Sequence, residues 1–428
     1  MKLTLLLSTL SLLLLTSCLE DECRESITYY VYETVTISEA DWRGETFTYE
    51  APREEMCDPS GFYVYGDYLF VIDRNEGLHI LDNRNNDDPR AIGFVGIPGG
   101  QGIAVRNNVL YISQYLDLVT FDLSSPAKPV FLNRAKDVFE AHSVFAGQVA
   151  GTGEYVLQYV PTTETVEADC NDGYAASRYY RDNYFYSTNA DLANFGQVSA
   201  PVTETVGQGG SLARFTITNG TLYAVDDSKL RTFSLAKPAE PQLMGTVDLG
   251  WGIETIFPYG DQLYIGSTTG MHIYDATEPL APEYLSTFQH VRSCDPVVVQ
   301  DDIAYVTIWG GSTCGNLEDQ LIVIDVSDPR SPRELQSTVM SQSHGLGVSD
   351  DRLFLCSGTE GLKVFDLTDN GLLNKQIGQD KGFNAKDVIV RGDRQELIVF
   401  GWERAGIRQY DFSKDGGLVP VSALDICK

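Results

Sequence analysis

Two histidines and several carboxylates occupy one recurring position in this sequence, just before a short apolar segment. Lining up that position along the chain gives Asp58, Gln101, His142, Ser211, Glu254, Asp295, His344 and Asp387. Imidazole and carboxylate groups ligate divalent cations when they converge. We therefore predict a metal site for a divalent cation at His142, Glu254, Asp295 and His344. The alternative, which the residue types favour, is that these side chains bond backbone amides in a narrow polar channel.

A second group with recognition chemistry lies in the irregular stretch 161–210. Residues 173–186 contain six aromatic side chains and two arginines. Tyrosine and arginine are favoured at recognition surfaces because they bury a large area and keep a polar tip. We predict a ligand-binding platform at Arg178, Tyr179, Tyr180, Arg181 and Tyr184. The equally weighted alternative is that these rings only cover neighbouring strands.

The cysteines suggest cross-linking and lipid attachment rather than a zinc site. They are Cys18, Cys23, Cys57, Cys170, Cys294, Cys314, Cys356 and Cys427. Cys294 and Cys314 flank a strand and a glycine-rich loop and are the predicted disulfide. Cys356 lies in an apolar strand and is predicted to be a buried thiol. No pair has the C-x-x-C spacing that is typical of zinc ligands.

The N-terminus has the pattern of an export signal. Lys2 is followed by a leucine-rich run to Leu15, which is too short to span a bilayer comfortably. Leu15-Thr16-Ser17-Cys18 resembles a bacterial lipobox, which implies that residues 1–17 are removed and Cys18 is acylated. The alternative is an ordinary signal peptide that happens to contain Cys18. The acidic residues that follow resemble the signal that sends Bacteroidetes lipoproteins to the outer surface, so we favour the cell surface over the periplasmic face of the outer membrane.

Charge excludes one class of partner. The chain has 31 basic and 60 acidic residues and a formal net charge of −29. Such a charge repels phosphate backbones, so we expect no nucleic-acid binding. We expect contact with the membrane through the N-terminal lipid only.

A repeat of about forty residues organises the rest of the chain and must position the groups above. Successive strand cores lie 41 to 49 residues apart, with one longer gap in the middle. The cores are 69–71, 110–112, 222–224, 263–265, 304–306, 353–355 and 397–399. Each is preceded by a turn rich in Asn, Asp or Gly and followed by a second strand that usually ends in aspartate. This predicts four antiparallel strands per unit and an all-β protein, a β-propeller of four-stranded blades.

The segment Leu-Ile-Val-Ile-Asp-Val-Ser-Asp-Pro at 321–329 resembles the LVIVD-repeat family of bacterial lipoproteins. The resemblance covers about residues 60 to 427 and implies β-propeller-like repeats in an exported protein. It implies little about activity, because one propeller fold hosts many functions.

The blade number depends on the middle of the chain. Residues 141–145 and 155–160 read as the first strands of a degenerate blade. Counting it gives eight blades and omitting it gives seven, and we favour eight. The predicted organisation is a signal peptide at 1–17, an acidic tether and N-terminal strand at 18–50, and one propeller at 51–428 with the insertion 161–210. The strand at 28–38 would either pair with the last blade to close the ring or lie over one face.

Polar residues that recur at one position in the repeat are expected to stabilise the fold. The aspartates that close the second strands are expected to cap the following turns. They are Asp82, Asp122, Asp275, Asp325, Asp366 and Asp411. His79 and His272 share a repeat position with lysine and arginine, so we expect a solvated strand face there.

Catalytic signatures with a known mechanism, such as a nucleophile elbow or a phosphate-binding loop, are missing from the sequence. We therefore predict a lipid-anchored binding or scaffold module at the bacterial cell envelope, with a protein or glycan as its ligand. The alternative is a hydrolase or lyase that uses a polar, metal-dependent site at the mouth of the propeller channel.

Overall fold

The computed structural model describes residues 24–44, 46–53, 56, 59–74, 76–140, 149, 152–169, 206–289, 296–309, 318–401, 406–413 and 417–424. The chain divides into two compact units. The first comprises Met1–Thr34 and Tyr159–Thr188, and the second comprises Val35–Gln158 and Asn189–Lys428. The described residues of the first unit belong to β1 (Arg24–Ser38) and β11 (Glu154–Asp169), which pair with each other and continue into the second unit.

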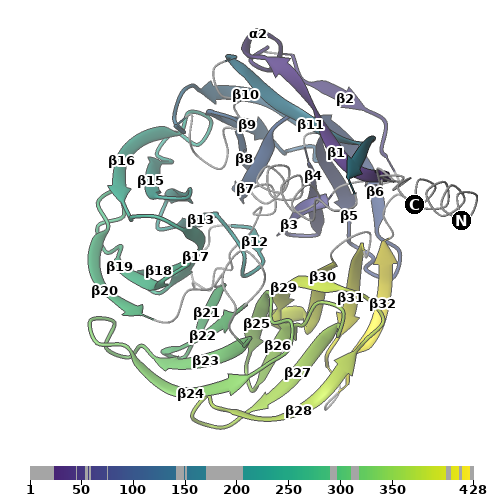
Figure 1. Ribbon diagram of the computed structural model, residues 1–428. Helices are drawn as coiled ribbons and strands as arrows, with labels where there is room; N and C mark the ends of the chain where they lie inside the picture. The colour runs from purple at the N-terminus through teal and green to yellow at the C-terminus, as the bar shows by residue number, and fades with distance from the viewer. Residues whose placement is uncertain are drawn as a thin grey trace, which may run out of the picture. The chain divides into compact units, whose positions relative to one another are not determined.

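The second unit is a ring of seven antiparallel sheets, each with four consecutive strands (Figure 1). We name these blades A to G in chain order. Blades A and B are β3 (Pro59–Tyr65), β4 (Tyr68–Asp73), β5 (Gly77–Asp82) and β6 (Arg90–Gly96), then β7 (Gly100–Arg106), β8 (Val109–Gln114), β9 (Asp117–Asp122) and β10 (Val130–Ala135). Blades C and D are β13 (Phe215–Thr218), β14 (Thr221–Val225), β15 (Lys229–Ser234) and β16 (Gln242–Asp248), then β17 (Ile253–Tyr259), β18 (Gln262–Ser267), β19 (Gly270–Asp275) and β20 (Glu283–Gln289).

Blades E to G complete the ring. Blade E is β21 (Val297–Gln300), β22 (Ile303–Ile308), β23 (Gln320–Asp325) and β24 (Arg333–Val339). Blades F and G are β25 (Leu346–Ser349), β26 (Arg352–Cys356), β27 (Leu362–Leu367) and β28 (Leu373–Asp380), then β29 (Ala385–Arg391), β30 (Glu396–Gly401), β31 (Ile407–Asp411) and β32 (Val419–Leu424). The first strand of each blade is the innermost, and the first strands of consecutive blades contact one another. The links between blades, and the loops between second and third strands, therefore lie on one face of the ring, which we call the linker face.

Two further strands widen blade A. β2 (Thr48–Glu50) pairs with the outermost strand β6, and β12 (Gln208–Gly209) pairs with the innermost strand β3. The short helix α2 (Glu39–Trp42) is capped by Ser38, whose hydroxyl accepts a hydrogen bond from the Asp41 amide. Among the described residues, no helix has the length and apolar character needed to cross a membrane.

The turns follow the predicted chemistry. Asn108, Asp302 and Asp350 adopt positive φ in the hairpins, which Asn and Asp tolerate better than most residues. The strand-closing aspartates were correctly predicted as turn caps, because five of the six accept a backbone N–H from two residues later. These five are Asp82, Asp122, Asp275, Asp325 and Asp411. Asp366 instead accepts a bond from the Asn374 amide group, at 2.8 Å.

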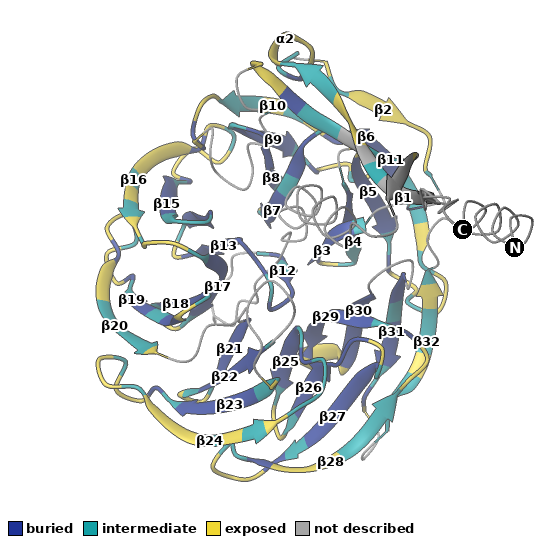
Figure 2. Cartoon of the chain, in the orientation of Figure 1, coloured by how far each residue is buried: buried dark blue, intermediate teal, exposed yellow. Residues whose placement is uncertain are grey.

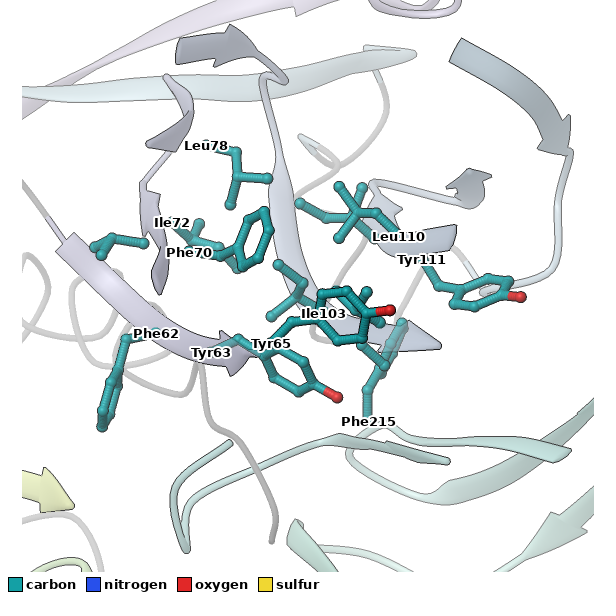
Figure 3. Close-up of a cluster of buried hydrophobic side chains, with 14 of the residues drawn as sticks. Phe62, Tyr63, Tyr65, Phe70, Ile72, Leu78, Ile103, Leu110, Tyr111 and Phe215 are labelled. Carbon is teal, nitrogen blue, oxygen red and sulfur yellow. The ribbon is translucent and has the colours of Figure 1, made fainter. Parts of the chain in front are cut away.

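Hydrophobic burial between blades holds the ring together. Figure 2 shows buried inner strands and exposed outermost strands, such as β16, β20 and β24. At the junction of blades A and B, apolar side chains including Phe70, Ile103 and Leu110 pack into one cluster (Figure 3). Each apolar side chain so buried contributes roughly 1.5–3 kcal/mol.

The prediction of eight blades was wrong, because the structure has seven. Tyr155–Val160 belongs to β11, and β11 pairs with β1 rather than forming a blade. The strand predicted at 28–38 likewise pairs with β11 and not with the last blade. Residues 141–148 lie outside the described residues.

The expectation of a solvated face at His79 was also wrong. His79 is 1% exposed, and its Nε2 lies 3.1 Å from the Asp73 carboxylate. Arg231, at the same repeat position, is buried and bonded to Asp226. A basic side chain is tolerated here because an acid from the same blade lies beside it.

Candidate functional site

Residues 206–212, which we call the central strap, connect several blades at the centre of the ring, where Figure 1 shows β12. Val206 forms a β-bridge with Arg106 of blade B, and the Gly207 amide donates to the Val105 carbonyl at 2.9 Å. Gln208 then pairs with Val64 of blade A. The strap is thus fixed to the inner strands of blades A and B through backbone hydrogen bonds.

The far end of the strap binds blades F and G. The Gln208 side-chain amide donates to the Val390 carbonyl at 2.7 Å. The Ser211 hydroxyl donates to the Asp387 carboxylate at 2.9 Å and accepts the Leu346 amide at 2.9 Å. Residues that precede β13 therefore hold the first strands of two blades far along the chain.

Asp387 is the chemical centre of this junction. Its buried carboxylate also accepts backbone N–H groups from Ser211, Leu212 and Val388, at 3.1, 3.4 and 2.9 Å. Burial disfavours the charged form and raises the pKa of Asp387 to about 7, although these hydrogen bonds favour the anion. The side chain is enclosed by the strap and by blade F, so its role is structural.

Glycines make the close approach possible. A Cβ on Gly210 would lie 2.0 Å from Asp387 Oδ2, and one on Gly207 would lie 2.2 Å from the Tyr63 ring. Gly207 and Gly210 are therefore required by packing against the inner strands.

His344 lies on the linker face between blades E and F. Its ring packs edge-on against Trp309, with 4.8 Å between centroids, and its backbone amide donates to the Cys356 carbonyl at 2.9 Å. Burial, with a smaller contribution from the nearby Lys386 ammonium, lowers the pKa of His344 to about 4, although Asp319 opposes the shift. The imidazole is therefore neutral at pH 7. Lys386 would also oppose a divalent cation at this position.

The predicted ring of pre-strand residues is partly assembled. Ser211 and Asp387 bond each other, whereas Gln101 lies in β7 and Glu254 is buried in β17. Asp58, His142 and Asp295 lie outside the described residues. Among the residues that are described, no group of three or more His, Cys, Asp or Glu is arranged to hold a metal ion. The four-residue metal site remains a prediction, since the structure describes only Glu254 and His344 of it.

The other predicted sites fall mostly outside the described residues. This holds for Cys18, for Cys294 and Cys314, and for Arg178, Tyr179, Tyr180, Arg181 and Tyr184. Cys356 is described and was correctly predicted to be a buried thiol. Burial raises the pKa of Cys356 well above its usual value, so the thiol is unreactive at neutral pH.

Sequence reasoning missed Trp251, on the link between blades C and D. Its indole is 70% exposed, whereas Trp42 is buried. Gly250 and Gly252 flank it with φ of +91° and +82°, a region that favours glycine. A tryptophan between two glycines, at the predicted end of a blade, is the signal that identifies such a loop.

The fold defines the protein as a β-propeller with seven four-stranded blades. Residues 60–89, 100–137 and 292–339 match the LVIVD repeat, so the chain carries the repeat predicted from its sequence. No curated protein matches the sequence.

Solved structures resemble the chain in fold. A proposed 6-phosphogluconolactonase of Bacteroides fragilis is 10% identical, with a TM-score of 0.54 over 86% of this chain and 97% of that one. The periplasmic gluconolactonase PpgL of Pseudomonas aeruginosa is 8% identical, with a TM-score of 0.53 over 86% and 96%. The computationally designed protein Ika8 is 7% identical, with a TM-score of 0.51 over 88% and 91%. At these identities the likeness concerns the fold alone.

Proposed function

We propose that this propeller is a binding or scaffold module of the bacterial cell envelope that holds a protein or glycan ligand on its linker face. The observation that carries the proposal is the central strap. The strap forms hydrogen bonds with the inner strands of blades A, B, F and G, so the residues at the centre of the ring hold the blades together. Ligand contacts then belong to the loops that link the blades.

The state of the titratable groups supports binding over hydrolysis. Asp387 has a pKa suited to acid–base chemistry, but its carboxylate is buried beneath the strap. His344 is neutral at pH 7 and packs on Trp309. The lactonase names of two structural neighbours describe those proteins and carry no activity to this chain.

The envelope location rests on the sequence. Lys2, the apolar run to Leu15 and Cys18 form the lipobox-like signal, and the acidic residues after Cys18 favour the cell surface. A lipid at Cys18 would place the propeller in water beside the membrane.

The test measures ligand binding by purified protein that begins at Leu19. Glycan arrays and pull-down from envelope extracts are compared for the wild-type sequence and a variant with Tyr179, Tyr180 and Tyr184 changed to alanine. We expect saturable binding that the triple variant weakens at least tenfold, because aromatic anchors dominate recognition. Alanine at Tyr49 and Tyr284, two exposed tyrosines on outer strands, is the control and should have no effect. Absence of binding in both assays contradicts the proposed function, and unchanged binding by the triple variant removes the tyrosine platform.

A further inference from the structure

Trp251 has the highest exposed fraction of any large apolar side chain among the described residues, at 70%. An exposed indole keeps a large apolar area in contact with water, which is unfavourable in free energy. Tryptophan is enriched at binding sites, where a ligand covers this area. Trp251 lies on the linker face between blades C and D, the face on which we propose that the ligand binds.

The loop that carries Trp251 is held on both sides. The Gly250 amide donates to Asp248 Oδ1 at 2.9 Å, and the Leu249 amide donates to the Ser228 carbonyl at 2.7 Å. On the other side, the Thr268 amide donates to the Gly252 carbonyl at 2.7 Å. The indole is thus presented from a fixed backbone, which reduces the entropy lost on binding.

The following residue is fixed as well. The Ile253 amide donates to the Asp227 carbonyl at 3.0 Å, and its carbonyl accepts a bond from the buried Arg214 guanidinium at 3.0 Å. Trp251 therefore lies between two segments that cannot move without breaking hydrogen bonds of the blades.

Carboxylates flank the loop. The Asp227 side chain is 41% exposed, with one oxygen 3.8 Å from the buried Arg214 guanidinium, and Asp248 is exposed next to the turn that it caps. A carboxylate oxygen accepts hydrogen bonds from hydroxyl groups, and the electron-rich face of an indole attracts the C–H face of a pyranose ring. The same carboxylates, in a chain of net charge −29, repel phosphate and uronate groups.

We propose that Trp251 is the stacking anchor of a site for a neutral glycan, with Asp227 and Asp248 accepting hydrogen bonds from its hydroxyl groups. This inference rests on the proposed binding function and names its ligand class. A protein ligand would need a cluster of apolar anchors around the indole. Along this loop two glycines flank Trp251, and the apolar residues beyond them, Leu249 and Ile253, pack into the core. The exposed acidic side chain of the loop is Asp248, which fits a sugar better than an apolar protein anchor.

The test is retention of the protein by neutral polysaccharides. Affinity electrophoresis through gels that contain amylose, mannan, soluble cellulose ether or β-1,3-glucan is run for the wild-type protein and for Trp251→Ala, Trp251→Phe and Tyr284→Ala. We expect Trp251→Ala to weaken retention at least tenfold and Trp251→Phe to weaken it less, because phenylalanine keeps a smaller aromatic face. Tyr284 is exposed on outer strand β20, so Tyr284→Ala is the matched aromatic control and should be retained as the wild type is.

A second readout follows the indole itself. The retained oligosaccharide should shift the tryptophan emission of the wild type to shorter wavelength and protect it from acrylamide, and Trp251→Ala should abolish both changes. Retention of Trp251→Ala equal to wild type overturns the Trp251 site and leaves the proposed binding function standing. Lack of retention on every polysaccharide, with a protein ligand lost in Trp251→Ala, overturns the glycan assignment. Lack of any ligand on arrays or in pull-down overturns the proposed function as well.

Discussion

At the scale of single residues, Asp387 shows how burial and hydrogen bonding compete. Four donor groups surround its carboxylate, yet its pKa rises to about 7 because the site is closed to water. The folded state therefore binds a proton that the unfolded state releases near pH 4. The free energy of unfolding that depends on this proton is present below pH 4 and is lost as the pH rises toward 7.

We predict that Asp387→Asn removes this pH dependence, since asparagine resembles the protonated acid. Between pH 4 and pH 8 the wild type should lose on the order of 4 kcal/mol of unfolding free energy relative to the variant. Urea unfolding at each pH measures the difference.

Taking the difference also cancels the effect of His344. The lowered pKa of His344 makes the free energy of unfolding rise with pH between about 4 and 6.5. Because His344 is present in both proteins, this effect is the same in each. Asp393→Asn, at an exposed carboxylate, is the control and should follow the wild-type curve. If the unfolding free energies of Asp387→Asn and the wild type change with pH in parallel, the Asp387 carboxylate is ionised over the whole range from pH 4 to pH 8, which contradicts the prediction.

Residue roles could be predicted from the sequence where the interaction is local. The aspartate caps bond an amide only two residues away, so repetition of the motif was enough to identify them. The partner of His79, Asp73, is local too. His79 is buried because strand β6 covers it, and the sequence pattern of its own strand does not reveal this neighbour. Trp251 was missed because its exposure depends on two glycine conformations.

At the scale of elements, the central strap depends on glycine for contact rather than for flexibility. Gly210 has no Cβ to collide with Asp387, and the rigid backbone on both sides cannot give way. We predict that Gly210→Ala lowers the free energy of unfolding by about 1–3 kcal/mol, the usual cost of overpacking. Urea unfolding measures the loss, and limited proteolysis should cut the variant faster in residues 206–212.

Gly44→Ala is the matched control, since a Cβ there would meet only the Asp41 carbonyl at 3.6 Å. It should leave both measurements within experimental error of the wild type. An equal response of the two variants would mean that the strap tolerates a side chain.

The strands of the blades were predictable, whereas the pairing of β11 was not. Each hairpin joins neighbouring segments, so alternating apolar residues and turn residues determine it. The start of β11, Tyr155–Val160, is as apolar as a blade strand, but its partner β1 lies more than a hundred residues earlier. Composition alone cannot distinguish these two pairings, and the predicted eighth blade failed for this reason. The strap was missed because its bonds are long-range as well.

At the scale of the whole molecule, blades A and G meet without sharing a strand among the described residues. Phe62 stacks on Phe400 with 5.4 Å between ring centroids. Asn83 and Gln409 exchange two side-chain hydrogen bonds of 2.8 Å. Contacts between side chains therefore join blades A and G, in place of a strand from one blade pairing with the other.

The predicted lipid anchor also belongs to this scale. We expect the wild type in the detergent phase of membrane fractionation, and we predict that Cys18→Ser is not acylated and keeps residues 1–17, so that its intact mass includes this segment and lacks the lipid. Mass spectrometry of the N-terminal peptide should find an acylated Cys18 only in the wild type.

Cys23→Ser, five residues further on, is the control and should stay acylated at Cys18. An aqueous wild-type protein, with a free N-terminus elsewhere, would contradict the lipobox interpretation.

The connection of Ser211 to Asp387 has a consequence for the order of assembly. One partner lies near the midpoint of the polypeptide and the other is made only when the last blade emerges from the ribosome. The contact therefore cannot form until nearly all of the chain has been synthesised. The early blades must remain incompletely fastened until the last blade is available.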